Sequence, residues 1–289
     1  SRRIVVAGSE GGLKPDRLML RGSNPLENIV GIPEYLVITH VKFMEAVRPL
    51  IDLRRSQGLE VMLVDVEDIY DRYNAGIMSP FAIQAFIHEL KEKSDDGRRL
   101  RYVFLVGGAT YDYREVTPNP NNYVPTIHSN AVGHLPEYAP LLSVDDFYIY
   151  VHPEDEIDDA RSIGYKAETR YTISIGRLPS TNIESVEAYV DKVIEYEQVQ
   201  PMEGDKRRAL VIAAHGYHLE AERFSEHRAM EGFTKHMVLA KDDVNGADIQ
   251  GKVISSINKG CDVLFFAGHG SWGIWKTGEA SRAIDQTDV

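Results

Sequence analysis

The sequence predicts an α/β protein made of two consecutive three-layer units with mainly parallel sheets. Short apolar runs rich in β-branched residues alternate with segments of helical periodicity over residues 34–108, and the same alternation returns over 208–271. A polar joint at 200–208 separates the two stretches. A succession of strand, helix and strand favours right-handed crossovers, and such crossovers build a parallel sheet with helices on its faces.

The composition is that of a soluble globular protein and argues against several kinds of partner. Of the 289 residues, 43% are apolar and 26% are charged. The net charge of −12 argues against nucleic acid and against an anionic membrane surface as partners, since both require a basic face. No apolar run approaches the length of a membrane span. The single cysteine, Cys261, rules out an internal disulfide framework.

Neither end of the sequence has the features of a complete terminus. Residues 1–12 lack the charged-then-apolar order of a signal peptide, and the last residues, AIDQTDV, end without a completed element. We therefore expect a piece of a longer polypeptide. Its parts would be a lead-in from a preceding region over 1–31, a first α/β subdomain over 32–200 and a second α/β subdomain over 201–289.

The first subdomain begins with three predicted strands and the helices between them. EYLVITH (34–40) is a short apolar run typical of a buried strand, and residues 41–58 follow with helical spacing. LEVMLVDV (59–66) predicts the next strand. A helix then opens at Ser79-Pro80, with serine at the N-cap and proline at the first helical position. RYVFLVGG (101–108) predicts a third strand that ends in glycines.

Residues 109–170 break this rhythm and are rich in Pro, Asn, Asp and Tyr. The acidic run PEDEIDDA (153–160) favours a solvated loop, and a calcium site built from its carboxylates is the alternative. Regularity returns with TISIGRLP (172–179), a predicted strand. Thr181 and Glu184 then form a predicted capping box, which starts a helix that runs to about Glu197.

The second subdomain repeats the α/β pattern. RALVIAAH (208–215) predicts a strand, residues 221–236 a helix, and HMVLA (236–240) a short strand. A further helix is expected over 248–259. CDVLFFAGHGS (261–271) then provides the last strand and its exit loop.

The sequence GHGSWG (268–273) formally matches two motifs that its context disfavours. A dinucleotide-binding loop requires a helix that starts within the glycines, and the following IWKTGEASRAID is a poor helix start. A hydrolase elbow around Ser271 requires a later histidine, and no histidine follows position 269.

A third interpretation makes His269 itself the reactive group. VLFFAG (263–268) is fully apolar, which predicts a central strand buried on both faces. Catalytic groups of open α/β sheets lie beyond the carboxyl ends of strands, where His269 falls. Gly270 would let the backbone approach a substrate, and its N–H could hold an oxyanion. The alternative is a histidine packed under a loop, and the flanking glycines favour the functional interpretation.

Cys261 cannot be the nucleophile that His269 would activate. It lies eight residues before His269, at the start of the same predicted strand. At about 3.3 Å per residue, the two side chains would be roughly 26 Å apart. We expect Cys261 to be a buried apolar residue. A nucleophile would then lie beyond Val289, or there would be none.

Several segments, taken in order, resemble the gingipain-like cysteine peptidases, family C25 of the caspase-like clan. FFAGHGSWGIW resembles the histidine strand of that family. The resemblance runs from about residue 34 to the end of the sequence. The other segments that carry it are EYLVITH with its helix, LEVMLVDVEDIY, RYVFLVGGATYDYR, Pro125-Thr126 with SVDDFYIYV, and SIGRLPSTNIESVEAYVDKVIEYE.

The resemblance implies a caspase-like fold and a cysteine endopeptidase with a histidine–cysteine dyad. His269 matches the catalytic histidine, and Gly270 matches the glycine whose N–H helps to hold the oxyanion. The cysteine would follow the next strand, past Val289, so that 201–289 would be a catalytic subdomain that stops before its nucleophile and is inactive alone. The expected partners are protein or peptide substrates and the rest of the same polypeptide.

One feature of the family is missing from its usual place. Members often carry an acid at the end of the strand matching 208–215, where it orients the histidine, but this sequence has Ala213, Ala214 and His215 there. Glu220 or Glu222 could reach in from the following segment, or the dyad would work without a third member. The remaining polar residues of this stretch, among them Tyr217, are expected to form a polar loop rather than a zinc site.

The resemblance also bears on metal, location and alternative functions. Members are often calcium-stabilised and secreted or anchored at the bacterial surface. No cofactor is required, and a structural calcium ion could use Asp145, Asp146, Asp155 and Asp158. The alternatives to a protease are a catalytically inactive scaffold or binding module and a sortase-like transpeptidase of the same fold.

Overall fold

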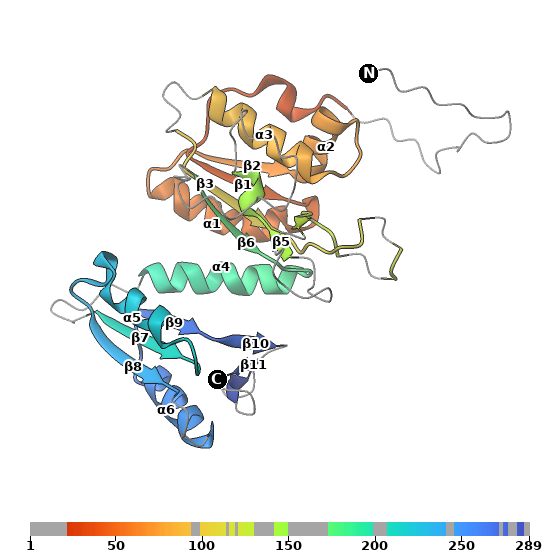
Figure 1. Cartoon of the computed structure of the whole chain (residues 1–289). Helices are drawn as coiled ribbons and strands as arrows, with labels where there is room; N and C mark the ends of the chain where they lie inside the picture. The colour runs from red at the N-terminus through yellow and green to blue at the C-terminus, as the bar shows by residue number, and fades with distance from the viewer. Residues whose placement is uncertain are drawn as a thin grey trace. The chain divides into compact units, whose positions relative to one another are not determined.

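The computed structural model confirms an α/β fold with parallel sheets. The structure describes residues 22–93, 99–113, 116–118, 121–129, 142–149, 173–198, 207–240, 246–271, 274–276 and 282–285. The chain divides into two compact units, Ser1–Val199 and Gln200–Val289 (Figure 1). Among the described residues, no helix combines the length and the apolar composition that crossing a membrane would require.

The first unit is built on a four-stranded sheet in the order β2-β1-β3-β6. Its strands are β1 (Tyr35–Thr39), β2 (Val61–Asp65), β3 (Tyr102–Val106) and β6 (Ser174–Leu178). Every neighbouring pair is parallel. All four strands lie where the apolar runs predicted them.

Two helices cover each face of this sheet (Figure 1). α1 (Met44–Ser56) and α4 (Ile183–Gln198) pack on one face, and α2 (Val66–Asn74) and α3 (Pro80–Glu92) pack on the other. Successive residues of β1 serve opposite faces. Val37 packs with α1 and α4, whereas Leu36 and Ile38 pack with α2 and α3.

Helix α2 was not predicted from the sequence, although it carries a local start signal. The side chain of Asp65 accepts a hydrogen bond from the backbone N–H of Glu67 at 3.1 Å, which caps the helix. The helix ends at Ala75, which has a left-handed backbone with φ of 52°. At nine residues the segment is short, and no Pro or Gly separates it from the preceding strand.

The capping box predicted for α4 was wrong by one residue. The side chain of Asn182 accepts the backbone N–H of Ser185 at 2.8 Å, and the helix starts at Ile183. Asn182 is therefore the N-cap in place of Thr181. Asparagine and threonine both cap helices well, so the sequence offered two adjacent candidates.

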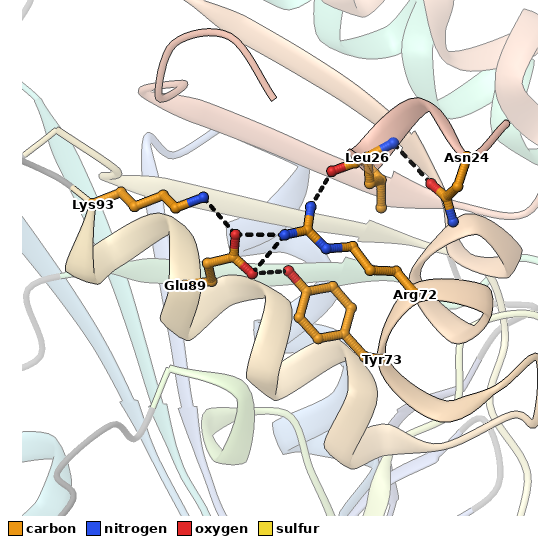
Figure 2. Close-up of polar contacts among 6 residues, drawn as sticks. All are labelled: Asn24, Leu26, Arg72, Tyr73, Glu89 and Lys93. Carbon is orange, nitrogen blue, oxygen red and sulfur yellow. Dashed lines mark hydrogen bonds and ion pairs between the residues drawn. The ribbon is translucent and has the colours of Figure 1, made fainter. Parts of the chain in front are cut away.

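A polar cluster centred on Glu89 joins α2 and α3 to the first described residues (Figure 2). The Arg72 guanidinium binds the Glu89 carboxylate at 2.8 Å and also donates to the Leu26 carbonyl. Tyr73 donates its hydroxyl to Glu89, and Lys93 donates to it at 2.6 Å. Arg72 thereby ties the short helix η1 (Pro25–Asn28) to the body of the unit.

Between β3 and β6 the described chain contains one small antiparallel pair. β4 (Ile127–Ser129) pairs with β5 (Leu142–Val144), and the short helix η3 (Asp146–Tyr148) follows. The acidic run at 153–160 lies outside the described residues.

The second unit has a three-stranded parallel sheet in the order β8-β7-β9. Its strands are β7 (Arg208–Ala213), β8 (Thr234–Leu239) and β9 (Val263–Ala267). α5 (His218–Glu226) packs on one face and α6 (Gly246–Asn258) on the other. This unit therefore also has three layers.

The helix predicted over 221–236 was wrong at both ends. α5 begins at His218 and ends at Glu226, and the short helix η5 (Arg228–Met230) follows. Gly232 then takes a left-handed backbone with φ of 84°, and β8 begins at Thr234. That backbone stops any continuing helix, because only glycine adopts it at little cost.

Two predictions about the last strand also need correction. β9 is at the edge of the described sheet and not at its centre, with Leu264 36% exposed, whereas β7 is the central strand. The residues expected as an exit loop form β10 (His269–Ser271), which pairs with β11 (Ile274–Lys276). β11 in turn pairs with β12 (Arg282–Asp285). An apolar run indicates that a strand packs against apolar neighbours. It does not indicate whether the strand is central, because strand order depends on pairing with distant segments.

Candidate active site

The carboxyl edge of the second sheet contains a point where the chain path divides. β7 lies between β8 and β9, so the chain leaves β7 toward one neighbour and later returns on the other side. Loops that follow two such strands diverge and leave a crevice, the usual ligand site of open α/β sheets. The loop after β7 carries Tyr217, and the residues after β9 carry His269.

Two aromatic stacks hold the end of β9 from opposite faces. The ring of Phe265 stacks on Phe224 of α5, with centroids 4.1 Å apart and planes within 10°. The ring of Phe266 stacks on Trp275 of β11, with centroids 4.6 Å apart and planes within 11°. The two stacks therefore hold β9 on both of its faces, and His269 follows the second stacked residue, Phe266, by three positions.

Gly268 has a steric reason to be glycine. A Cβ atom at this position would lie 2.7 Å from the Cβ of Ala214 and 2.7 Å from the ring of Phe266. The close approach lets β7 and β9 stay paired to their last residues, where the Ala214 N–H donates to the Ala267 carbonyl at 2.8 Å. Gly268 is therefore a glycine because of close packing at the carboxyl ends of β7 and β9.

Gly270 is under no such restraint. A Cβ atom there would lie 3.4 Å from the carbonyl oxygen of Ile274, which is an ordinary contact distance. Gly270 is exposed, and it pairs with Trp275 in the antiparallel strands. Packing alone therefore does not require glycine at this position.

His269 is exposed and contacts one aromatic side chain from the β7 loop. The hydroxyl of Tyr217 lies 3.1 Å from Nε2 of His269. The two rings meet edge to face, with centroids 5.4 Å apart and planes at 89°. The sequence predicts a polar loop at Tyr217 and gives no sign of this pairing, which joins residues 52 positions apart.

Glu220 and Glu222, the acids considered as orienting partners, are exposed on α5. Within the described part of the chain, the hydrogen-bond partner recorded for the His269 ring is Tyr217, and neither glutamate is brought to it. The group next to the imidazole is thus a neutral phenol.

Cys261 lies at the other end of β9 from His269. It precedes the first residue of the strand, is half-buried, and packs beside the apolar cluster of Leu210, Ile212 and Val253. The five residues of β9 separate the thiol from the imidazole. Cys261 therefore cannot share a proton with His269.

In the first unit, Asp145 pairs with the partly buried Arg177. The guanidinium of Arg177 binds both carboxylate oxygens of Asp145, at 2.6 and 2.8 Å. It also donates to the carbonyls of Gly107 at 2.8 Å, Val124 at 2.7 Å and Pro125 at 3.2 Å. This bidentate pair fixes the segments that follow β3 and precede η3.

The calcium prediction therefore depends on other carboxylates. Asp145 neutralises Arg177, so its oxygens are less available to a cation, and Asp146 is exposed at the start of η3. No group of three or more potential metal ligands occurs among the residues that the structure describes. Asp155 and Asp158 lie outside them.

The second unit is a parallel α/β sheet with a tyrosine–histidine pair at its switch point, the place where open α/β sheets bind ligands. The profile of peptidase family C25 matches residues 30–289. The chain belongs to peptidase family C25. This confirms the gingipain-like resemblance found in the sequence.

The solved structures similar to this chain include two that it covers only in part. One is dimeric latent PorU from Porphyromonas gingivalis, at 20% identity and a TM-score of 0.48, with 58% of this chain and 16% of that chain covered. The other is described as "Structure of Protease", at 17% identity and a TM-score of 0.52, with 83% of this chain and 46% of that chain covered. The similarity to the second structure supports the fold. This chain spans less than half the length of either structure. A search of curated protein sequences found no match.

Proposed function

We propose that this chain is the bulk of the catalytic domain of a cysteine endopeptidase in which His269 is the general base. The observation that carries the proposal is the position of His269, at the switch point of the second sheet in a chain of peptidase family C25. Since Cys261 lies at the wrong end of β9, the nucleophile would come from polypeptide that follows Val289.

The proposed reaction proceeds through a thioester. His269 takes the thiol proton as the sulfur attacks the peptide carbonyl carbon, so that a C–S bond forms and the carbonyl electron pair moves to oxygen. The N–H of Gly270 would hold that oxyanion. On collapse the C–N bond breaks, and His269 returns the proton to the leaving amine. Water then cleaves the thioester, with His269 again acting as the base.

The substrates, partners and location that we propose are based on the same family membership. The substrates would be proteins or peptides, and the second partner would be the rest of the same polypeptide. No cofactor takes part in the proposed chemistry, although a structural calcium ion is part of the proposal. We further propose that the protein acts outside the cell or at the bacterial surface.

A catalytically inactive scaffold is the second candidate. The observation in its favour is that a phenol, and not a carboxylate, contacts His269. A sortase-like transpeptidase would use the same dyad and would differ in its products. Analysis of the cleaved ends distinguishes the two enzymes, because a protease leaves free carboxylates and a transpeptidase leaves new amide bonds.

The test is covalent labelling of the full-length protein with a thiol-reactive peptide electrophile at neutral pH. We expect one adduct per chain by intact mass, on a cysteine beyond Val289, and its loss in a His269→Ala variant. The matched control is Cys261→Ser, which should keep the adduct, because that thiol is remote from the site. A folded full-length protein that forms no adduct would favour the scaffold.

A further inference from the structure

We infer that Tyr217 is the positioning residue for His269, with its phenol oxygen accepting the imidazole Nε2–H so that Nδ1 exchanges the proton with the thiol. This inference rests on the proposed peptidase function and deepens it. The family usually uses an acid for this role, and this chain brings a tyrosine to the histidine from the turn after β7.

The Tyr217 contact restrains the imidazole in two ways. The 3.1 Å hydrogen bond to Nε2 fixes which edge of the ring faces the phenol. The edge-to-face contact at 89° fixes the plane of the ring. An exposed histidine without such contacts samples several rotamers, so the two restraints together select one orientation.

Tyr217 is itself held in place. It is half-buried and packs against the apolar cluster of Val211, Ala213 and Ala221 under α5. Its backbone N–H donates to the Ala214 carbonyl at 3.0 Å, in a turn where Gly216 has φ of 83°. The phenol is therefore fixed before any substrate binds, as an effective supporting residue requires.

A phenol oxygen suits both protonation states of the proposed base. Before attack, Nδ1 must offer a lone pair, so the neutral ring carries its proton on Nε2 and donates it to Tyr217. After the thiol proton arrives at Nδ1, Nε2–H still donates to the same oxygen. The hydrogen bond to His269 thus lasts through the cycle without adding a net charge to the site.

The chain contains a matched pair that serves as a control. Tyr113 and His128 in the first unit also meet edge to face, with centroids 5.6 Å apart and planes at 83°. The hydroxyl of Tyr113 lies 2.8 Å from Nδ1 of His128 and also donates to the Thr126 carbonyl. Removing this hydroxyl changes a tyrosine–histidine pair that has no part in the proposed reaction.

The experiment measures peptide hydrolysis by the full-length protein and its variants. Tyr217→Phe keeps the ring and removes the hydroxyl, and we expect kcat to fall about tenfold with KM unchanged. Tyr113→Phe should leave both constants within about twofold of wild type. The 15N spectrum of labelled histidine should show Nε2–H as the main neutral tautomer of His269, and this preference should be lost in Tyr217→Phe.

Two results would overturn the inference alone. The first is an active wild-type enzyme whose Tyr217→Phe variant keeps kcat within about twofold, whether or not its KM rises. The second is an unchanged His269 tautomer in that variant. A full-length protein that neither cleaves peptides nor reacts with the electrophile would instead overturn the proposed function, and the inference with it.

Discussion

Gly268 and Gly270 flank the same histidine but are glycines for different reasons. At Gly268 a Cβ atom would lie 2.7 Å from two neighbours, Ala214 and Phe266, whereas at Gly270 the nearest atom would be at 3.4 Å. The first position is set by packing. The second is open, which is consistent with the proposed role of its N–H toward a substrate.

Gly268→Ala should therefore destabilise the protein by about 1–3 kcal/mol, because the methyl group forces β7 and β9 apart at their carboxyl ends. The same shift would move His269 and lower kcat. Urea unfolding of the full-length protein measures the change in stability, and Gly270→Ala is the matched control, expected to change the unfolding free energy by less than about 0.5 kcal/mol. Equal stabilities of the two variants would refute this explanation.

At the scale of elements, the Glu89 cluster links α2 and α3 through polar contacts (Figure 2). Burial of the carboxylate opposes its ionisation. Hydrogen bonds from Lys93 and Tyr73 and the charge of Arg72 outweigh that effect, so the pKa of Glu89 lies below its usual value. A carboxyl group whose pKa is lowered on folding stabilises the protein above its unfolded pKa, and this stabilisation is lost as the pH falls through the folded pKa.

Glu89→Gln should lower the unfolding free energy at pH 7 by about 1.5–3 kcal/mol, the range for hydrogen bonds to charged groups. The difference from wild type should begin to shrink below about pH 4, where the carboxyl of the unfolded chain takes up a proton, and should be lost as the pH falls through the lowered pKa of the folded protein. Urea unfolding at both pH values measures this. Glu187→Gln, on the exposed face of α4, should have little effect at either pH. A Glu89 effect independent of pH would contradict the assigned charge.

At the scale of the whole molecule, acidic residues outnumber basic ones by 44 to 32. In the folded protein these excess negative charges repel one another, which lowers stability, and a bound cation reduces the repulsion. The acidic run at 153–160 concentrates five acids in six positions, 154 to 159. It is therefore the part of the sequence that offers the most carboxylate ligands to a cation that prefers oxygen, such as calcium.

Calcium should raise the Tm of the full-length protein, and a chelator should lower it. At about a hundredfold excess over Kd, one bound ion stabilises a fold by about 2.7 kcal/mol. A double Asp155→Asn and Asp158→Asn variant should lose the shift. Asp145→Asn should lower the Tm but keep the calcium response, because Asp145 pairs with Arg177. Magnesium at equal concentration is the control. An identical Tm in calcium and in chelator would exclude the site.

The sequence by itself determined most of the elements and the place of His269. Apolar periodicity and flanking glycine or proline are local signals, and they located the strands of the two parallel sheets and the helices α1, α3, α4 and α6. The apolar run that precedes His269 likewise placed it just beyond the carboxyl end of a strand. A buried segment must be apolar wherever it lies in the fold. Its pattern can therefore be recognised from neighbouring residues alone.

The tertiary structure alone decided the strand order and the partner of His269. Which strand is central depends on pairing between distant segments, so the apolar run of β9 could not reveal that β7 takes that place. The contact between Tyr217 and His269 joins residues 52 positions apart. It exists because β7 and β9 pair in register up to Ala214, and no local pattern encodes that meeting.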